Sequence, residues 1–342
     1  MTKLLPAALL AAAAWAGAAP LGAGVIAPAR ADTIKPAILF DMGGKFDKGF
    51  NEGVYNGGQK FTKTTGIKIQ EFEVQNEGQR EQGLRNFAKH GDDPVLAIGF
   101  AQADGLTVVA KEYPKTDFGI IDMVVDLPNV HSFVFKEQEG SYLAGMLAAM
   151  AAGSGGKVGF IGGMDIPLIR KFGCGYVQGV KAVDPNMDVM QNMTGSTPAA
   201  WNDPVRGGEL AKSQMERGAT VVYAAAGATS LGVYQAVADA GKLAIGVDSD
   251  VDYLHPGHML TSMVKHVDVA TEDLFTDAKN GKFTPGVSVL GLKENGVDVA
   301  FDQYNEKLIK PEWKSKVEAA KKDIIDGKIE VHDYMSDNKC PF

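Results

Sequence analysis

The sequence predicts an α/β protein built on parallel sheets, and two observations support this fold class. From residue 34 onward, short apolar or β-branched runs alternate with segments whose apolar residues recur at helical spacing. Several of these runs end in turns rich in glycine or aspartate, such as "LFDMGG", "IIDMVVD" and "IGVDSD". Because open α/β sheets bind ligands beyond the carboxyl ends of their strands, the repeated turns indicate a binding rim.

Each predicted element follows from one of these two patterns. The predicted strands are 35–40, 67–72, 95–99, 118–122, 132–135, 157–161, 187–191, 220–223, 243–247 and 259–264. Helical patterns between them include 51–64, 81–89, 140–152 and 231–240. Residues 133–140, "FVFKEQEG", predict a first crossing between lobes, where a strand meets the charged start of a helix. The helix that follows is apolar on nearly all sides, so we expect it to be buried.

The first 31 residues have the features of a secretory signal. A lysine near the start precedes a long Ala- and Leu-rich run that ends in Ala-Arg-Ala, a cleavage site of the A-x-A type. Prolines and glycines interrupt this run before about 18–20 apolar residues accumulate, which favours cleavage over membrane anchoring. We therefore expect cleavage near Ala31, a mature chain that begins at Asp32, and a periplasmic location.

The size and charge of the mature chain set further limits. Removing 31 residues from 342 leaves 311, more than a single core usually organises, so two lobes are expected. The removed segment carries Lys3 and Arg30, and their loss takes the formal net charge from −8 to −10. Such an acidic chain lacks the positive charge that binds nucleic acid. Cys174 and Cys340 can pair in an oxidising compartment, and the sequence leaves open whether they do.

Motifs for catalysis or metal binding are scarce. The chain has neither the G-x-S-x-G nucleophile motif nor the G-x-x-x-x-G-K-[ST] phosphate loop. His255, His258 and His266 lie within twelve residues, but a proline and a predicted strand separate them, and no pair has helical i, i+4 spacing. We therefore expect no metal site, no cofactor and no enzymatic activity.

Aromatic, carboxylate and amide side chains gather instead near the ends of predicted strands. Carboxylates accept hydrogen bonds from vicinal hydroxyls, asparagine both donates and accepts, and aromatic faces stack on planar bases. Taken singly, each of these residues also fits a turn, a helix cap or a packed ring. The candidate ligand-binding residues are Asp41, Phe46, Asn51, Asp122, Trp201, Tyr223 and Asp248.

The order of these motifs resembles the basic membrane protein family of ABC-transporter substrate-binding proteins, whose best-understood members are purine nucleoside receptors. The resemblance covers essentially the whole mature chain. Gly49 stands where the family usually has serine, and no lipobox cysteine precedes the mature chain. The segments that carry the resemblance are "FDMGGKFDKGFNEG", "AIGFAQADGL", "YPKTDFGIID", "FKEQEGSYLAG", "GKVGFIGGMDIPLIRKFGCGYVQG", "AAGATSLGVYQA", "IGVDSD" and "LTSMVKHVDVA".

The resemblance implies a type I periplasmic-binding-protein fold, with two Rossmann-like lobes joined by a multi-strand hinge. We expect one lobe to hold residues 32–136 plus about 260–285, and the other 137–259 plus about 286–342. A monomer is the family expectation.

The resemblance also implies roles for single residues. Asp41 and Asn51 would bond the edge of a purine base, and Phe46 would stack on one of its faces. The second stacking ring is either Tyr223 or Trp201, each of which matches a recurring aromatic of the family.

The remaining candidates would bind the sugar. Asp122, Asp248 and the backbone of Gly227 would hold the ribose hydroxyls, and Lys265 would brace that side. Three aspartates in one cleft would repel phosphate, so a nucleoside should be preferred to a nucleotide.

The implied function is delivery of a purine nucleoside to an ABC permease in the inner membrane. A binding protein for sugars or other small metabolites is an alternative, because rings and carboxylates serve pyranosides equally well. An exported nucleoside hydrolase is a further alternative, although the acidic residues are scattered one per strand end. A further alternative is a sensory protein that binds a ligand and docks on a receptor kinase.

Overall fold

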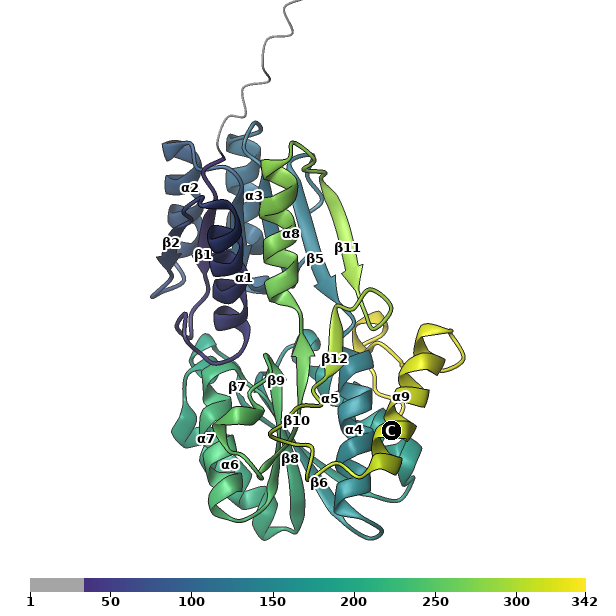
Figure 1. The fold of residues 1–342 in the computed structure, drawn as a ribbon. Coiled ribbons are helices and arrows are strands. Elements are labelled where there is room, and N and C mark those ends of the chain that lie inside the picture. The colour runs from purple at the N-terminus through teal and green to yellow at the C-terminus, as the bar shows by residue number, and fades with distance from the viewer. Residues whose placement is uncertain (1–33) are drawn as a thin grey trace, which may run out of the picture. The chain divides into compact units, whose positions relative to one another are not determined.

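The computed structural model describes residues 34–342, which form two α/β lobes, each with a six-stranded sheet between helices (Figure 1). This is the type I periplasmic-binding-protein architecture expected from the sequence. The expected signal segment, residues 1–31, lies outside the described residues.

The sheet of the first lobe is parallel throughout. Its strands, in spatial order, are β11 (Gly286–Leu290), β5 (Val130–Phe135), β4 (Phe118–Ile121), β3 (Val95–Ile98), β1 (Ala37–Phe40) and β2 (Gln70–Glu73). Two helix pairs cover it, α1 (Phe50–Thr65) with α8 (Val267–Lys279) and α2 (Gln79–His90) with α3 (Ala103–Glu112). Alternate residues of the strands belong to separate apolar clusters, so each pair covers its own face.

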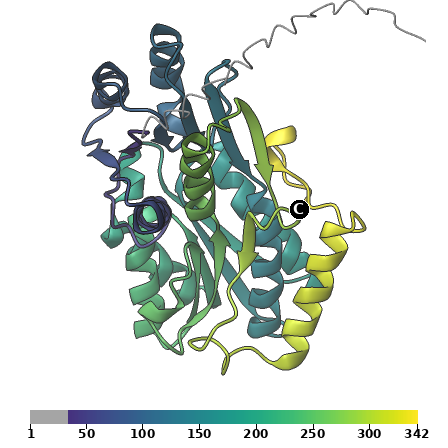
Figure 2. The ribbon, with the colours of Figure 1, turned by 45° about the horizontal axis from the view of Figure 1, so that its top comes forward.

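The sheet of the second lobe is parallel except for one edge strand. Its spatial order is β12 (Val297–Val299), β10 (Met259–Lys265), β9 (Leu243–Asp248), β8 (Ala219–Ala225), β6 (Lys157–Met164) and β7 (Asp188–Gly195), with β12 antiparallel to β10. Helices α4 (Glu137–Ala152) and α5 (Pro167–Val183) pack together, as do α6 (Pro204–Glu216) and α7 (Ser230–Asp239). Helix α9 (Pro311–Ile325) packs on the outside of α4 (Figure 2).

The chain crosses between the sheets three times, and the crossings differ from the expected boundaries. The first, between β5 and α4, lies within residues 133–140 as predicted. Strand β10 was divided by the expected boundary at 260, yet all of it pairs in the second sheet. Strand β11 was assigned to the second lobe, yet it pairs with β5 in the first. The chain therefore changes lobes after Lys265 and again after Leu290.

Helix α4 is buried on nearly all sides, as its composition predicted, because it lies between the second sheet, α5 and α9. Among residues 34–342 no helix is both long and apolar enough to cross a membrane.

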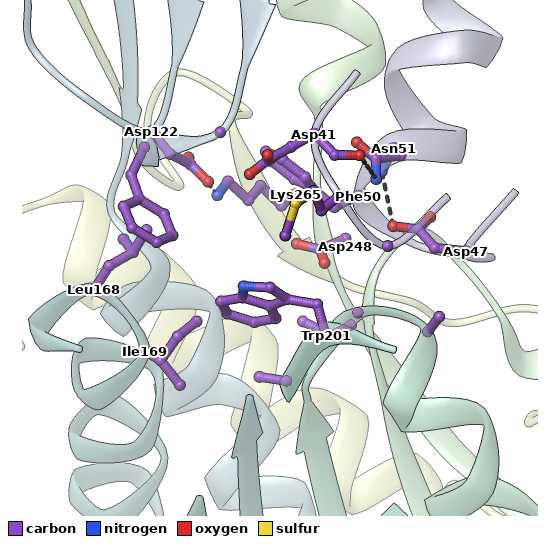
Figure 3. Close-up of a pocket in the computed structure, with 18 of the residues that line it drawn as sticks. Asp41, Asp47, Phe50, Asn51, Asp122, Leu168, Ile169, Trp201, Asp248 and Lys265 are labelled. Atoms are coloured by element: carbon purple, nitrogen blue, oxygen red, sulfur yellow. Dashed lines mark hydrogen bonds and ion pairs between the residues drawn. The ribbon is translucent and has the colours of Figure 1, made fainter. Parts of the chain in front are cut away.

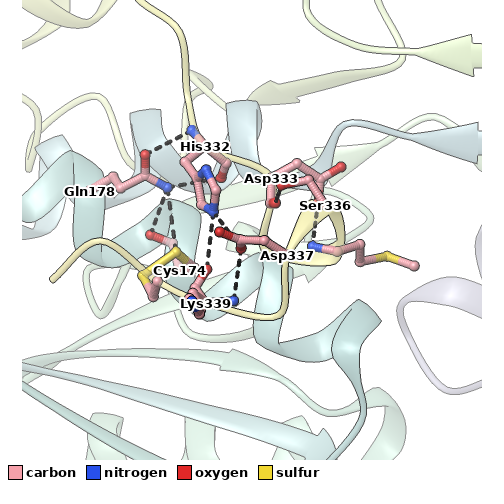
Figure 4. A network of polar contacts seen from close by, with 9 residues as sticks. Cys174, Gln178, His332, Asp333, Ser336, Asp337 and Lys339 are labelled. Carbon is pink, nitrogen blue, oxygen red and sulfur yellow. Dashed lines mark hydrogen bonds and ion pairs between the residues drawn. A yellow bond between two sulfur atoms is a disulfide. The ribbon is translucent and has the colours of Figure 1, made fainter.

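A disulfide fixes the C-terminal segment to helix α5 (Figure 4). Cys174 and Cys340 are bonded, with their Cα atoms 5.6 Å apart, so the pairing that the sequence left open is formed. Beside it, Gln178 Nε2 donates to His332 O at 3.0 Å, and His332 N donates to Gln178 Oε1 at 2.8 Å. These bonds hold the segment against the helix whose first turns line the cavity described below.

Candidate functional site

A cavity lies between the lobes where the carboxyl ends of both sheets meet (Figure 3). About 650 Å³ between the lobes is free of protein atoms, counting the part open to solvent. The lining residues are Asp41, Met42, Gly43, Asp47, Phe50, Asn51, Gly99, Phe100, Asp122, Leu168, Ile169, Phe172, Trp201, Ala225, Gly227, Ala228, Val247, Asp248 and Lys265.

Two of the lining aspartates have an uncommon backbone conformation. Asp122, after β4, has φ 73°, and Asp248, the last residue of β9, has φ 66°. Few residues other than glycine adopt positive φ, although aspartate does so more readily than most, and such residues cluster at functional sites. The conformation ends each strand sharply and leaves both carboxylates on the cavity wall.

Seven of the nine residues proposed from the sequence line this cavity. They are Asp41, Asn51, Asp122, Trp201, Gly227, Asp248 and Lys265. Phe46 and Tyr223 do not line it.

Phe46 lies outside the cavity, with 59% of its surface exposed. Its ring meets Tyr55 edge-on at a centroid distance of 5.2 Å, and Lys45 Nζ lies 5.1 Å from its centroid. The aromatic residue of this loop that lines the cavity is Phe50, at the start of α1. The sequence offered both rings within five positions, and the turn between them decides which one faces inward.

Tyr223 lies in the core of the second lobe. It is fully buried, its ring packs against Phe160 and Tyr176, and its hydroxyl lies 3.3 Å from Ser141 Oγ. Strand β8 continues to Ala225, so Tyr223 lies two positions below the rim. Of the two alternatives for the second ring, Trp201 is therefore the one at the cavity.

Trp201 stands on the second lobe's side of the cavity (Figure 3). It ends the short helix Pro198–Trp201, which Thr229 Oγ1 braces by donating to Ala200 O at 2.8 Å. The indole lies directly on the backbone of Gly163 in β6, where any added Cβ would overlap the ring. Glycine at 163 is thus required for the ring to sit against the end of the sheet.

The loop before α1 is held by Asp47. Its carboxylate accepts hydrogen bonds from the backbone N–H groups of Gly49, Asn51 and Glu52 at 2.9–3.1 Å. Burial raises the pKa of Asp47 to about 6, although the three N–H donors oppose the change. Asp47 was not among the residues proposed from the sequence, yet its carboxylate fixes the turn that leads into α1.

A buried chain of charges supports Lys265. Its Nζ lies 2.5 Å from Asp122 Oδ1 and 3.0 Å from Glu137 Oε1. Glu137 Oε2 in turn lies 2.7 Å from Lys171 Nζ, which also donates to Phe135 O at 2.8 Å. Burial alone would raise the pKa of Glu137, but Lys171 and Lys265 hold it below its usual value. Asp122 belongs to the first lobe and Lys265 to the second, so this chain joins the lobes beside the crossing.

Glu137 and Lys171 were not among the residues proposed from the sequence. In "FKEQEG" and "IRKFGCG" they read as ordinary surface charges, and nothing local signals that both are buried.

Asp248 faces the same cavity without an ion pair within 4.0 Å among the described residues. Burial raises its pKa to about 7; Lys265 opposes this, whereas Asp122, Asp47 and Glu137 add to it. Within residues 34–342 the Asp248 carboxyl group also has no hydrogen-bond partner, so its oxygens are available to donors of a ligand.

The lobes touch across the mouth of the cavity. Ser249 Oγ, after β9, donates to Gly49 O, before α1, at 2.9 Å. A Cβ on Gly49 would lie 3.5 Å from Asp248 Oδ2, so the serine usual at position 49 would place its side chain beside this carboxylate. The two lobes are thus in direct contact beside Asp248.

The three histidines do not gather into a metal site. His258 Nδ1 lies 3.1 Å from Lys242 O, and His266 Nδ1 lies 3.4 Å from Asp268 Oδ1. Within residues 34–342 the one acidic group spaced for an ion is Asp250, Asp252 and Asp302. Asp252 already accepts hydrogen bonds from Ser262 and Asn305, so this cluster has its own structural role.

Two α/β lobes with a cavity at the carboxyl ends of their strands have the architecture of the type I periplasmic-binding-protein fold. Comparison with protein families agrees: residues 34–334 match the family described as ABC transporter substrate-binding protein PnrA-like. The chain belongs to this family of ABC-transporter substrate-binding proteins.

Individual relatives match nearly the whole chain. The ABC transporter nucleoside-binding protein BmpA of Lactococcus lactis subsp. cremoris is 33% identical over 321 residues, which is 87% of this chain and 89% of that protein. The CD4+ T-cell-stimulating antigen of Listeria monocytogenes is 33% identical over 86% of this chain and 87% of its own. An ABC transporter solute-binding protein from Aeropyrum pernix K1 superposes with a TM-score of 0.81 at 27% identity, covering 87% of this chain and 92% of that one.

Proposed function

We propose that the protein binds a purine nucleoside in the cavity between its lobes and delivers it to an ABC permease in the inner membrane. The observation that carries the proposal is that Phe50 of the first lobe and Trp201 of the second both line one cavity. A planar base between two such rings gains stacking energy from both lobes, on the order of 1–3 kcal/mol for each ring. The ligand would thus stabilise the closed arrangement.

Hydrogen-bonding groups complement the rings. Asp41, directly after β1, and Asn51, in the first turn of α1, line the cavity and would bond a base edge. Asp122 and Asp248 are carboxylates that accept bonds from the vicinal hydroxyls of ribose, with Gly227 and Lys265 beside them. The Lactococcus relative, 33% identical, is named as a nucleoside-binding protein, which supports this class of ligand.

The charges of the cavity favour a nucleoside over a nucleotide. Asp41, Asp47, Asp122 and Asp248 all line it, and Lys265 is the lining cation. Lys265 is already engaged by Asp122 and Glu137, so a phosphate would meet repulsion without a free positive partner.

The signal-like segment 1–31 supports export to the periplasm, where a monomeric carrier would meet its permease.

A thermal-shift screen of the mature chain with nucleosides, nucleotides, free bases and sugars tests the proposal. A ligand bound by the folded state alone raises the melting temperature, so purine nucleosides should shift it most. If only sugars raise the melting temperature, the ligand is a sugar and not a nucleoside. Chromatography of the incubated nucleoside provides a second check, because release of free base would favour the hydrolase.

A further inference from the structure

The carboxylate of Asp41 forms an ion pair with Arg80, a residue that was not among those proposed from the sequence. Arg80, in α2, donates from Nε and Nη2 to Asp41 Oδ1 at 3.3 and 3.1 Å. Both side chains are largely buried, with 12% and 11% exposed. Burial raises the pKa of Asp41, and the Arg80 charge opposes this. The guanidinium does not lose its proton, so it favours an ionised Asp41, which can accept hydrogen bonds but not donate them.

The second oxygen of Asp41 lies on the cavity side of this pair. Both Arg80 contacts use Oδ1, whereas a Cβ added to Gly99, a lining residue, would lie 2.9 Å from Oδ2. The glycine, with φ 92°, leaves open the space around Oδ2 that a side chain would take.

Asn51 is also restricted to accepting. Its Nδ2 donates to Gly44 O at 3.2 Å and to Asp41 O at 3.5 Å, so both amide hydrogens are committed to carbonyl groups. The same two carbonyls fix which end of the amide is nitrogen. Its Oδ1 is buried and has no hydrogen-bond partner among residues 34–342. A buried polar atom of this kind normally has a partner, and any bond that Asn51 makes to a ligand must be accepted by Oδ1.

We propose that Asp41 and Asn51 form an acceptor-only subsite that selects a ligand edge with two adjacent N–H donors, and that Arg80 is the residue that positions and charges Asp41 for this selection. The inference rests on the proposed function and makes it more specific. Among purine nucleosides, the 2-amino-6-oxo edge of guanosine presents such donors at N1 and the 2-amino group. Inosine keeps the N1 donor and lacks the amino group. Adenosine presents an acceptor at N1, which would face a carboxylate.

Calorimetric titration of the mature protein with guanosine, inosine and adenosine tests the subsite. One hydrogen bond to a charged group corresponds to roughly ten- to a hundredfold in affinity. We expect guanosine to bind at least about tenfold more tightly than inosine, and adenosine more weakly than either. Comparable affinities for the three would overturn the inference and leave the proposed function standing. Absence of binding by every nucleoside would overturn both.

Two variants test the role of Arg80 and Asp41. Arg80→Gln removes the charge behind Asp41 and should reduce the ratio of guanosine to inosine affinity, and Arg80→Lys should restore part of it. Asp41→Asn introduces a donor and should lower guanosine affinity while adenosine loses little. Arg85→Gln is the matched control, because Arg85 lies on the same helix and pairs with Glu81 and Glu112. A guanosine-to-inosine ratio that is the same in wild type, Arg80→Gln and Arg85→Gln would show that Arg80 acts on stability alone and would overturn its proposed role.

Discussion

Glu137 Oε1 lies 3.0 Å from Lys265 Nζ, and both side chains are buried. One residue begins α4 directly after the first crossing, and the other ends β10 directly before the second. The ion pair therefore fastens two of the three connections between the lobes to each other, next to the cavity that Lys265 lines.

Replacing Glu137 with Gln should destabilise the protein strongly. The change leaves Lys265 and Lys171 buried with one carboxylate fewer between them, and breaking a buried pair by removing one partner costs about 3–5 kcal/mol. Urea unfolding at pH 7 measures the free energy of unfolding. Glu209→Gln is the control, since its pair with Arg206 is exposed and should contribute less than about 1 kcal/mol. Equal effects of the two changes would show that the buried chain is not a stabilising element.

Phe50→Ala should weaken nucleoside binding by about tenfold, whereas Phe46→Ala should leave it unchanged. Phe50 lines the cavity, and loss of a ring stacked on a base costs on the order of 1–3 kcal/mol. Phe46 is exposed outside it and serves as the matched aromatic control. Titration calorimetry of both variants measures the two affinities. A loss of affinity in Phe46→Ala alone would show that Phe46 stacks on the base, as first expected from the sequence.

Asp248→Asn should lower nucleoside affinity by roughly ten- to a hundredfold without lowering ligand-free stability. The amide keeps the shape, and asparagine tolerates the positive φ of this position. At pH 8, above the Asp248 pKa of about 7, the variant loses charge-assisted bonds to the ligand hydroxyls, so the titration is done at this pH. A ligand-free melt beside the titration distinguishes this role from a structural one, in which the melting temperature would fall and the affinity would stay.

The same variant predicts a pH dependence of ligand-free stability. The pKa of Asp248 is about 7 in the folded state and near 3.8 when unfolded, so the folded state binds more protons between these values. Its contribution to the free energy of unfolding therefore falls as pH rises from about 4 to 7, by at most about 1.4 kcal/mol per pH unit. The pKa of Glu137 is lowered on folding, so its contribution to the free energy of unfolding falls as pH decreases below its unfolded pKa of 4.5, outside this range. Urea unfolding between pH 5 and 7 should show a smaller decline with pH in Asp248→Asn than in wild type; identical profiles would contradict the assignment.

Much of the fold was predictable because it depends on local patterns. Strands β1 to β10 lie within a few residues of their predicted positions, since most of them are short apolar runs closed by a turn. Strands β11 and β12 were missed: β11 is a partly exposed edge strand and β12 spans three residues, so neither has a continuous buried run. This omission is also why the lobe boundary near residue 286 was misplaced.

The site was predictable where a residue type coincides with a strand end, as at Asp41, Asp122 and Asp248. The orientation of the aromatic rings was not predictable, because Phe46 and Phe50 both follow β1. The turn that Asp47 holds lies between them, and it determines which ring faces the cavity. The partners behind the site, Arg80, Glu137 and Lys171, come from distant segments, and pairing across the fold leaves no trace in local sequence.

Titration calorimetry of the mature protein with guanosine and with guanosine 5′-monophosphate measures whether the cavity binds a purine nucleoside and rejects its phosphate ester, as we propose. We expect saturable binding of one guanosine per chain, and an affinity for the monophosphate at least about a hundredfold lower because of the lining aspartates. Equal affinities would show that the aspartates do not exclude a phosphate, and the absence of binding by every purine nucleoside would overturn the proposed function.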